Sequence, residues 1–158
     1  YTIFRPVFFM DNFLGRDFRS QLMEGVLRMP LPPDKPLQMI AVTDIGAFVA
    51  MAFRDPDQWL GKELELAGDE LTMPQAAEIA HRTLGVPIRY EELPIDQVRQ
   101  QSPETAIMFE WFNREGYKAD IAALRKMYPP LLTLEEWIHK LQVSSELIEE
   151  QVLISMSG

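Results

Sequence analysis

The sequence predicts an α/β protein, the C-terminal part of a doubly wound sheet followed by a small helical lobe. Three observations support this fold class. Residues 1–9 form a nearly continuous run of apolar, β-branched and aromatic side chains, which is typical of a strand covered on both faces. Residues 37–93 alternate short apolar segments with amphipathic helical ones, and the pattern after Pro94 is helical.

The N-terminal part contains two expected strands with an irregular connection between them. The first strand covers residues 1–9, with Pro6 near its end because proline cannot donate to a central ladder. Residues 11–27 are expected to form a partly helical connection. Four prolines in residues 29–36 predict a surface loop without regular structure, and the apolar segment 37–42 predicts the second strand.

Apolar residues at helical spacing predict a helix over residues 45–53. Thr43 or Asp44 is expected to cap its N-terminus, and Asp55, which precedes a proline, is expected to end it. A Thr-Asp pair directly before an amphipathic helix indicates capping rather than catalysis. We therefore do not count Asp44 among the catalytic candidates.

Two further strands are expected from alternating patterns. Residues 62–68 alternate charged and apolar side chains, which predicts a strand with one exposed face, and residues 68–70 predict the turn that closes it. Residues 86–93 alternate in the same way, with the side chains of Val86, Ile88 and Tyr90 on one side.

The helix between these two strands has a clear start signal. Thr72 and Gln75 form a capping box, so the helix is expected over residues 73–84, and Gly85 is expected to end it. His81 falls on the exposed or boundary side of this helix, where an ordinary surface or packing role is expected.

The C-terminal third is expected to be helical. Ser102 begins a helix whose shared face is predicted to consist of Ile107, Met108, Trp111 and Phe112. Asp120 is expected to cap a further short helix, and Thr133 with Glu136 to form a second capping box. Residues 144–158 are expected to be a fringe helix or a disordered tail, so we place the end of the domain at residue 143.

Composition excludes several kinds of chemistry. The formal net charge is −9 and no basic patch is evident, so neither nucleic acid nor a membrane surface is an expected partner. The absence of cysteine excludes disulfides and thiolate sites, and the two histidines, His81 and His139, lie far apart, so no metal is expected. Without an apolar run of about 20 residues or a signal-peptide pattern, the protein is expected to be cytoplasmic.

Known catalytic and phosphate-binding motifs are missing from the sequence. The glycines are scattered, so no glycine-rich loop is available to bind a pyrophosphate. No Gly-x-Ser-x-Gly elbow, P-loop or Tyr-x-x-x-Lys pair is present. The residues alone therefore identify no catalytic group.

Four segments carry a family resemblance. They are, in order, "YTIFRPVFFMDNF", "MIAVTDIGAFVAMAF", "ELAGDELTMPQAAEIAHRTLGVPIRY" and "YKADIAALRKMYPPLLTLEEWIHK". Together they cover about residues 1 to 140, and the chain resembles the C-terminal half of an NmrA-like protein, from the atypical branch of the short-chain dehydrogenase/reductases. The resemblance implies a Rossmann-type sheet that binds NAD(P).

The resemblance also implies a site. Residues 2–6 correspond to the late sheet strand whose carboxyl end lies beside the nicotinamide. The cofactor-binding residues implied are Pro6, Val7, Phe8, Phe9 and Asn12. The substrate-pocket candidates are Met10, Phe13, Trp111 and Phe112, because the C-terminal helices form the substrate lobe in this family. From the residues alone, a buried strand followed by a capped helix, and an ordinary aromatic core, remain the alternatives.

The resemblance leaves the function open between two classes. In complete form the protein would be an NAD(P)-dependent reductase of a small carbonyl, quinone or similar electrophile, or a non-catalytic NAD(P)-sensing regulator that binds a regulatory protein. Residues 1–143 would supply the nicotinamide-side wall and the substrate lobe. NAD or NADP would then bind only together with an N-terminal half that carries the glycine-rich loop. A third interpretation is an interaction module that self-associates through an exposed sheet edge.

Overall fold

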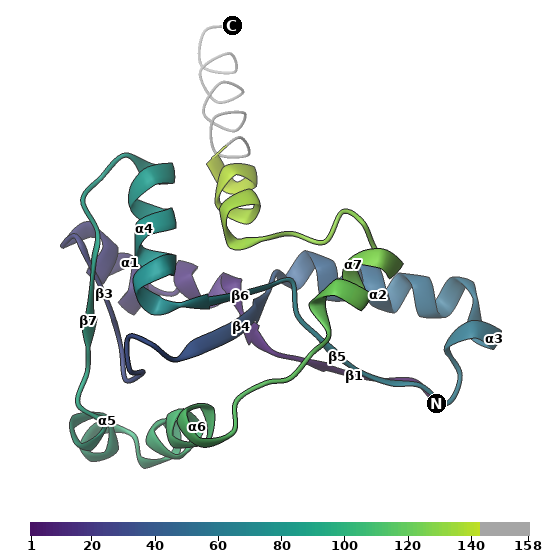
Figure 1. Cartoon of the computed structure of the whole chain (residues 1–158), viewed down its shortest axis with the longest axis horizontal. Helices are drawn as coiled ribbons and strands as arrows, with labels where there is room; N and C mark the ends of the chain where they lie inside the picture. Colours follow the sequence, from purple (N-terminus) through teal and green to yellow (C-terminus); the bar gives the residue numbers. More distant parts are fainter. Residues whose placement is uncertain (143–158) are drawn as a thin grey trace, which may run out of the picture.

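The computed structural model describes residues 1–142, and the strands of these residues form three separate sheets (Figure 1). The strands are β1 (Ile3–Pro6), β2 (Phe8–Phe9), β3 (Val26–Met29), β4 (Pro36–Ile40), β5 (Glu63–Leu66), β6 (Asp69–Thr72) and β7 (Arg89–Glu92). β1 pairs with β5, β2 with β4 and β3 with β7, all in parallel, whereas β6 runs antiparallel to β4. These parallel pairs and the helices between them confirm the predicted α/β class.

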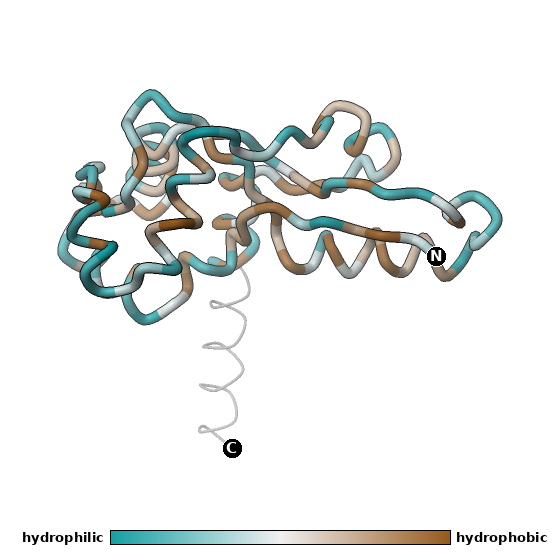
Figure 2. Tube along the Cα trace, turned by 90° about the horizontal axis from the view of Figure 1, so that it is seen from below, coloured by the Kyte–Doolittle hydropathy of each residue, from teal (hydrophilic) through white to brown (hydrophobic). Residues whose placement is uncertain are grey.

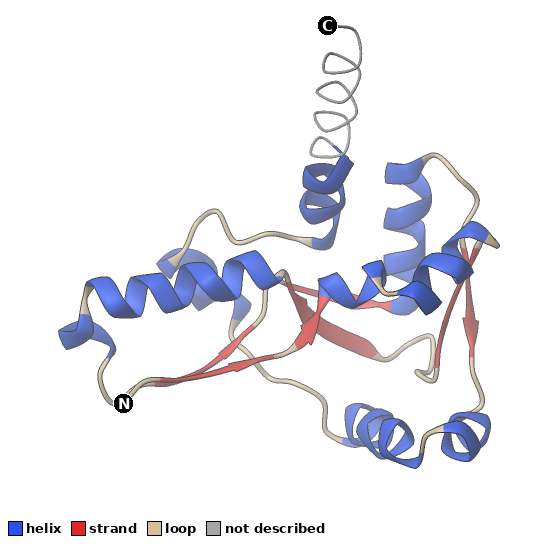
Figure 3. Cartoon of the chain, turned by 180° about the vertical axis from the view of Figure 1, so that it is seen from behind, coloured by secondary structure: helices blue, strands red, loops and turns tan. Residues whose placement is uncertain are grey.

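Helices cover both ends of this arrangement (Figure 3). They are the 3₁₀ helix η1 (Met10–Leu14) and the α-helices α1 (Arg16–Met23), α2 (Val42–Arg54), α3 (Pro56–Trp59), α4 (Met73–Leu84), α5 (Ile95–Gln101), α6 (Pro103–Arg114) and α7 (Ile121–Met127). Residues 134–142 are also helical. α2 lies along β1 and β5 at one end, and α5 and α6 lie together at the other (Figure 1).

The apolar core has two parts. One packs α2, α3 and α7 against the β1–β5 pair and contains Phe48, Trp59 and Leu124. The other packs α1, α4, α6 and residues 134–142 against β3 and β4, with Met39 and Phe109 among its buried members. In Figure 2 the helix beside the N-terminal strand, α2, is hydrophobic or neutral along most of its length, as expected for a helix packed against a sheet.

The N-terminus of α2 differs from the prediction. The helix begins at Val42 after Ala41, and neither Thr43 nor Asp44 caps it. Instead, the backbone N–H of Val42 donates to a carboxylate oxygen of Asp11 at 2.9 Å, so the capping group comes from η1. Asp44 lies in the first turn with only 2% of its surface exposed. The capping prediction was wrong because folding brings a distant carboxylate to the helix end.

Two strands were missed in the sequence. β3 falls in the region predicted as a connection and loop, because its ladder partner β7 lies about 63 residues away and no local pattern reveals it. β6 replaces the predicted turn at residues 68–70: the N–H of Gly68 donates to the carbonyl of Met39 at 2.8 Å, and antiparallel pairing with β4 follows directly.

Several local predictions are confirmed. α4 begins with the reciprocal capping box of Thr72 and Gln75 and ends at Gly85, whose φ of 70° is left-handed. Asp120 caps α7, and the backbone N–H of Glu136 donates to the hydroxyl of Thr133. Residues 144–158, predicted as a fringe helix or tail, lie outside the described residues.

The buried face of α6 is only partly the predicted one, because Phe112 is buried as predicted but Ile107 and Met108 are not. Its buried residues are Ala106, Phe109 and Phe112, whereas Ile107 is 65% exposed and Met108 41% exposed. Apolar residues occur on more than one side of this helix, so periodicity alone admits two choices of face. None of the helices among residues 1–142 combines the length and apolar character that crossing a bilayer requires.

Candidate functional site

A cleft of ≈ 550 Å³ lies between the η1–α1–β3 segment and the α5–α6 pair. Strand ends converge on it: Phe8 belongs to β2, Met29 is the last residue of β3, and Leu93 directly follows β7. Ligands of doubly wound folds bind outside the carboxyl ends of parallel strands. This cleft is therefore the candidate ligand site.

The lining combines an apolar surface with a few polar groups. Its larger apolar side chains are Phe8, Phe18, Met29, Met108 and Phe109. Its polar side chains are Asn12, Arg16, Asp17, Gln21, Arg28, Gln101, Ser102 and Thr105. This composition is typical of sites for small organic molecules, in which apolar contacts supply area and polar groups fix orientation.

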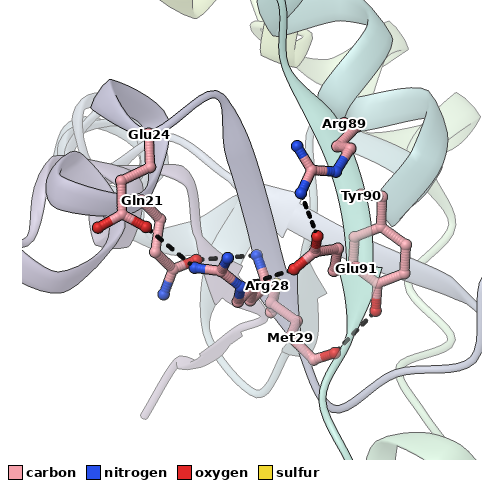
Figure 4. Close-up of polar contacts among 7 residues, drawn as sticks. All are labelled: Gln21, Glu24, Arg28, Met29, Arg89, Tyr90 and Glu91. Carbon is pink, nitrogen blue, oxygen red and sulfur yellow. Dashed lines mark hydrogen bonds and ion pairs between the residues drawn. The ribbon is translucent and has the colours of Figure 1, made fainter.

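Arg28 forms a compact network at the edge of the cleft (Figure 4). Its Nε donates to Glu91 at 2.8 Å and its Nη1 to Glu24 at 3.2 Å, while its backbone N–H donates to Gln21 Oε1 at 2.8 Å. The hydrogen bonds from Arg28 and then Arg89 lower the pKa of Glu91. Because two carboxylates already compensate its charge, Arg28 joins β3 to α1 and β7 instead of presenting a free cation.

Tyr90 stabilises the loop after β3. Its hydroxyl lies 2.8 Å from the carbonyl oxygen of Met29 and 2.5 Å from that of Leu31 (Figure 4 shows the first contact). Burial raises the pKa of Tyr90 to about 12. The phenol therefore stays protonated and holds the strand end that borders the cleft, and it does not act as an acid or base in it.

The cleft offers little for proton transfer. The ionisable side chains lining it are Arg16, Asp17 and Arg28, with no tyrosine, lysine or histidine among its lining residues. Within residues 1–142 no cluster of three or more histidine, aspartate or glutamate side chains is suited to hold a metal ion. The lining residues of the cleft thus provide apolar and hydrogen-bonding groups but no evident acid–base pair.

The five cofactor-binding candidates do not share one surface. Phe8 and Asn12 line the cleft. Pro6 ends β1, and Val7 is buried, with its N–H donating to the carbonyl of Leu66. Phe9 follows Phe8 in the strand, so its side chain projects to the opposite face, where it is 38% exposed.

The substrate-pocket candidates also separate. Met10 is fully buried in the core. Phe13 packs its ring against Phe8 and lies behind the wall of the cleft. Trp111 and Phe112 pack together with the ring of Tyr117 and do not line the cleft. Their α6 neighbours Met108 and Phe109 line it instead.

Sequence reasoning missed most of the polar lining of the cleft. Gln21 and Arg28 were overlooked because β3 was not recognised, although Gly25 and Pro30 bracket the apolar segment that forms it. The φ of Gly25 is 74°, which marks the turn into the strand. Ser102 was recognised as a helix cap, but nothing in the sequence indicates that its hydroxyl borders a cleft.

Parallel strand pairs connected by helices, with a cleft at the carboxyl ends of the strands, are the arrangement of a Rossmann-type fold. The chain belongs to the NmrA-like family, whose model matches residues 1–138. The resemblance drawn from the sequence is thereby confirmed.

Three solved structures illustrate the similarity. A nucleoside-diphosphate-sugar epimerase from Staphylococcus aureus is 22% identical with a TM-score of 0.70, over 87% of this chain and 51% of that one. NmrA, a negative transcriptional regulator solved in complex with NADP, is 19% identical with a TM-score of 0.65, over 94% and 54%. The triphenylmethane reductase of Citrobacter sp., complexed with NADP(H), is 16% identical with a TM-score of 0.68, over 86% and 51%. At these identities the likeness establishes the fold.

A curated relative, the prestalk A differentiation protein A of Dictyostelium discoideum, is 24% identical over 94 residues. The match covers 59% of this chain and 31% of the relative. The chain thus spans about half the length of the solved structures that it matches, and its match covers about a third of this relative.

Proposed function

We propose that this chain supplies the nicotinamide-side wall and the substrate lobe of an NAD(P)-dependent reductase-type protein that acts on a small electrophile, such as a carbonyl or quinone. The observation that carries the proposal is the cleft at the ends of β2, β3 and β7, with Phe8 and Asn12 in its wall. The triphenylmethane reductase complexed with NADP(H) supports it as a protein of similar fold.

The cofactor would bind in two parts. The ring of Phe8 and the side chain of Asn12 both line the cleft and would contact the nicotinamide. The pyrophosphate and adenosine need a glycine-rich loop at a helix N-terminus, which the sequence does not contain. These groups would be held by a preceding N-terminal half or by a partner chain, so the affinity of this chain alone for NADPH is expected to be low.

Saturation-transfer NMR tests this assignment directly. Irradiation of the protein in the presence of NADPH should transfer saturation to the nicotinamide protons and much less to the adenine protons. Asn12→Ala should reduce the nicotinamide signal. Gln58→Ala is the matched control, because Gln58 is also an exposed amide but lies on α3, outside the cleft lining. Equal transfer to adenine and nicotinamide, or no effect of Asn12→Ala, would contradict the proposal.

A second candidate function is a non-catalytic NAD(P)-sensing regulator that binds a regulatory protein. The lack of tyrosine, lysine and histidine among the lining residues favours it, and NmrA, a negative transcriptional regulator, shares the fold. NADPH oxidation by the complete protein against carbonyls and quinones separates the two candidates. Turnover supports the reductase, whereas tight NADPH binding without turnover of any substrate supports the regulator.

A further inference from the structure

A second hollow lies directly behind the wall of the cleft. It has a volume of ≈ 120 Å³ and is enclosed by η1, α1, β3, α4 and the helix over residues 134–142. Its lining consists only of phenylalanine, leucine, isoleucine, alanine and tryptophan residues, among them Leu27, Ala80, Leu134 and Trp137. We call it the apolar cavity.

The apolar cavity and the cleft share a wall made of aromatic rings. Phe13 lines the apolar cavity, and its ring centroid lies 5.7 Å from that of Phe8 and 5.4 Å from that of Phe18. Phe8 and Phe18 both line the cleft. A molecule in the apolar cavity would therefore contact one side of this aromatic wall, and a ligand in the cleft would contact its other side.

The mouth of the apolar cavity is marked by exposed leucines. Leu14 is 53% exposed and Leu84 is 39% exposed, and both belong to the lining. Large apolar side chains at a hollow give a hydrophobic molecule both a path from solvent and a contact surface on arrival.

The chemistry of the lining restricts what can bind. A charged or hydrogen-bonding group placed there would lose its water without gaining a partner, which costs several kcal/mol. A dry cavity of about 150 Å³ lined by leucine, isoleucine and phenylalanine binds benzene in an engineered protein, so the size here also suits a single ring.

We propose that the apolar cavity is a binding site for one uncharged hydrophobic molecule, or hydrophobic substituent, of about the size of a benzene ring. The site is separate from the cofactor assignment and does not depend on it. Its occupant packs against Phe13 and Trp137 and reaches the cleft only through the shared aromatic wall.

Benzene titrated into the full chain is the direct test. The melting temperature should rise with benzene concentration, because a ligand that binds only the folded state stabilises it. Benzoate, which has the same ring and a charge, should give no such rise. Intermolecular NOEs from benzene to the indole of Trp137 and the ring of Phe13 should locate the ligand. Absence of these NOEs at saturating benzene would overturn the proposal.

Two matched variants sharpen the test. Ala80→Leu places extra carbon atoms in the apolar cavity and should weaken benzene binding at least about tenfold. Ala122→Leu makes the same change at an exposed position of α7, outside the lining, and should leave binding unchanged. The NOEs need no variant, so the proposal stays testable if Ala80→Leu fails to fold. NOEs from residues 143–158 to Trp137 in place of those from benzene would show that the chain itself fills the cavity, and would also overturn the proposal.

Discussion

The carboxylate of Asp44 accepts a hydrogen bond from the backbone N–H of Leu132 at 2.9 Å, although 88 residues separate them in the chain. Asp44 lies in the first turn of α2, and Leu132 lies just before the helix over residues 134–142. Nearby, Arg125 donates to the carbonyls of Leu131 and Gly68. Buried polar contacts of this kind fix where the last helix sits against the sheet, and that helix forms one side of the apolar cavity.

Removing the Asp44 carboxylate should destabilise the fold. Asp44→Ala leaves the buried N–H of Leu132 without an acceptor, so the free energy of unfolding should fall by about 1–3 kcal/mol. Asp44→Asn keeps an oxygen acceptor and should cost less. Urea denaturation of the three proteins measures the difference. Equal losses in both variants would show that the hydrogen bond contributes nothing.

The same residue predicts a pH dependence. Burial raises the pKa of Asp44 above its ordinary value, while the hydrogen bond from Leu132 opposes this effect. The folded state then binds the Asp44 proton more tightly than the unfolded state does. The contribution of this protonation to the free energy of unfolding is therefore complete below the ordinary pKa of about 3.9, and it is lost as the pH rises through the raised value. Relative to Asp44→Asn, the wild-type chain should gain stability as the pH falls through this window. A constant difference between the two proteins across acidic pH would refute the prediction.

Substitution by alanine should lower the stability of the protein at one glycine and raise it at another. A Cβ on Gly68 would lie 2.4 Å from the carbonyl oxygen of Leu132, so Gly68→Ala forces the backbone apart and should cost about 1–3 kcal/mol. A Cβ on Gly46 meets nothing within 4 Å, and this residue lies inside α2. Gly46→Ala should therefore stabilise the protein by up to about 1 kcal/mol through helix propensity. Thermal denaturation of both variants tests the contrast, and a melting temperature that shifts in the same direction for both would contradict it.

Tyr90 should be identifiable by its titration. The wild-type chain should show a phenolate absorbance step at about pH 12 that is missing in Tyr90→Phe, because burial raises the pKa of Tyr90. The variant also loses the contacts to the carbonyls of Met29 and Leu31, and should lose about 1–2 kcal/mol of stability. Loss of a step near pH 10 in Tyr90→Phe, in place of the step at about pH 12, would mean that the phenol is accessible to solvent and would contradict the prediction.

The edge formed by β1 and β2 predicts self-association. Within residues 1–142, β1 pairs only with β5 and β2 only with β4, so one edge of each strand lacks a neighbour. Sedimentation velocity of the isolated chain should show concentration-dependent dimers or larger species. Ile3→Lys places a charge on this edge, where Ile3 is 37% exposed, and should favour the monomer.

Val86→Lys serves as the control for this prediction, because Val86 is 45% exposed but lies before β7, away from that edge. It should leave the self-association unchanged. A wild-type chain that stays monomeric at every concentration would overturn the prediction.

Local signals predicted much of the fold. The capping box of Thr72 and Gln75 and the left-handed Gly85 fixed both ends of α4, because these contacts span only a few residues. The apolar run at residues 1–9 indicated strand structure correctly, but the prediction of one strand covered on both faces was wrong: β1 and β2 are separate, and Ile3, Arg5 and Phe9 are exposed. β3 was missed since a four-residue strand has no local signal apart from the residues that bracket it, and its hydrogen bonds depend on a distant partner.

The candidate site was predictable only in part. The resemblance placed Phe8 and Asn12 at the end of a sheet strand, and the structure brings both to the cleft. It did not indicate Arg28 or Thr105, because these residues reach the cleft from elements whose placement depends on packing. Trp111 was an expected pocket residue and is instead packed against Phe112 and Tyr117.

The sequence by itself determined what neighbours along the chain decide: which segments are helical, and where caps, prolines and glycines end them. Only the tertiary structure decided the pairing of β3 with β7, the capping of Val42 by Asp11, and the face that α6 turns toward the cleft. The physical reason is that an apolar pattern favours burial of a segment but specifies neither which face is covered nor what covers it. A long-range polar contact exists only after folding has brought its two partners together.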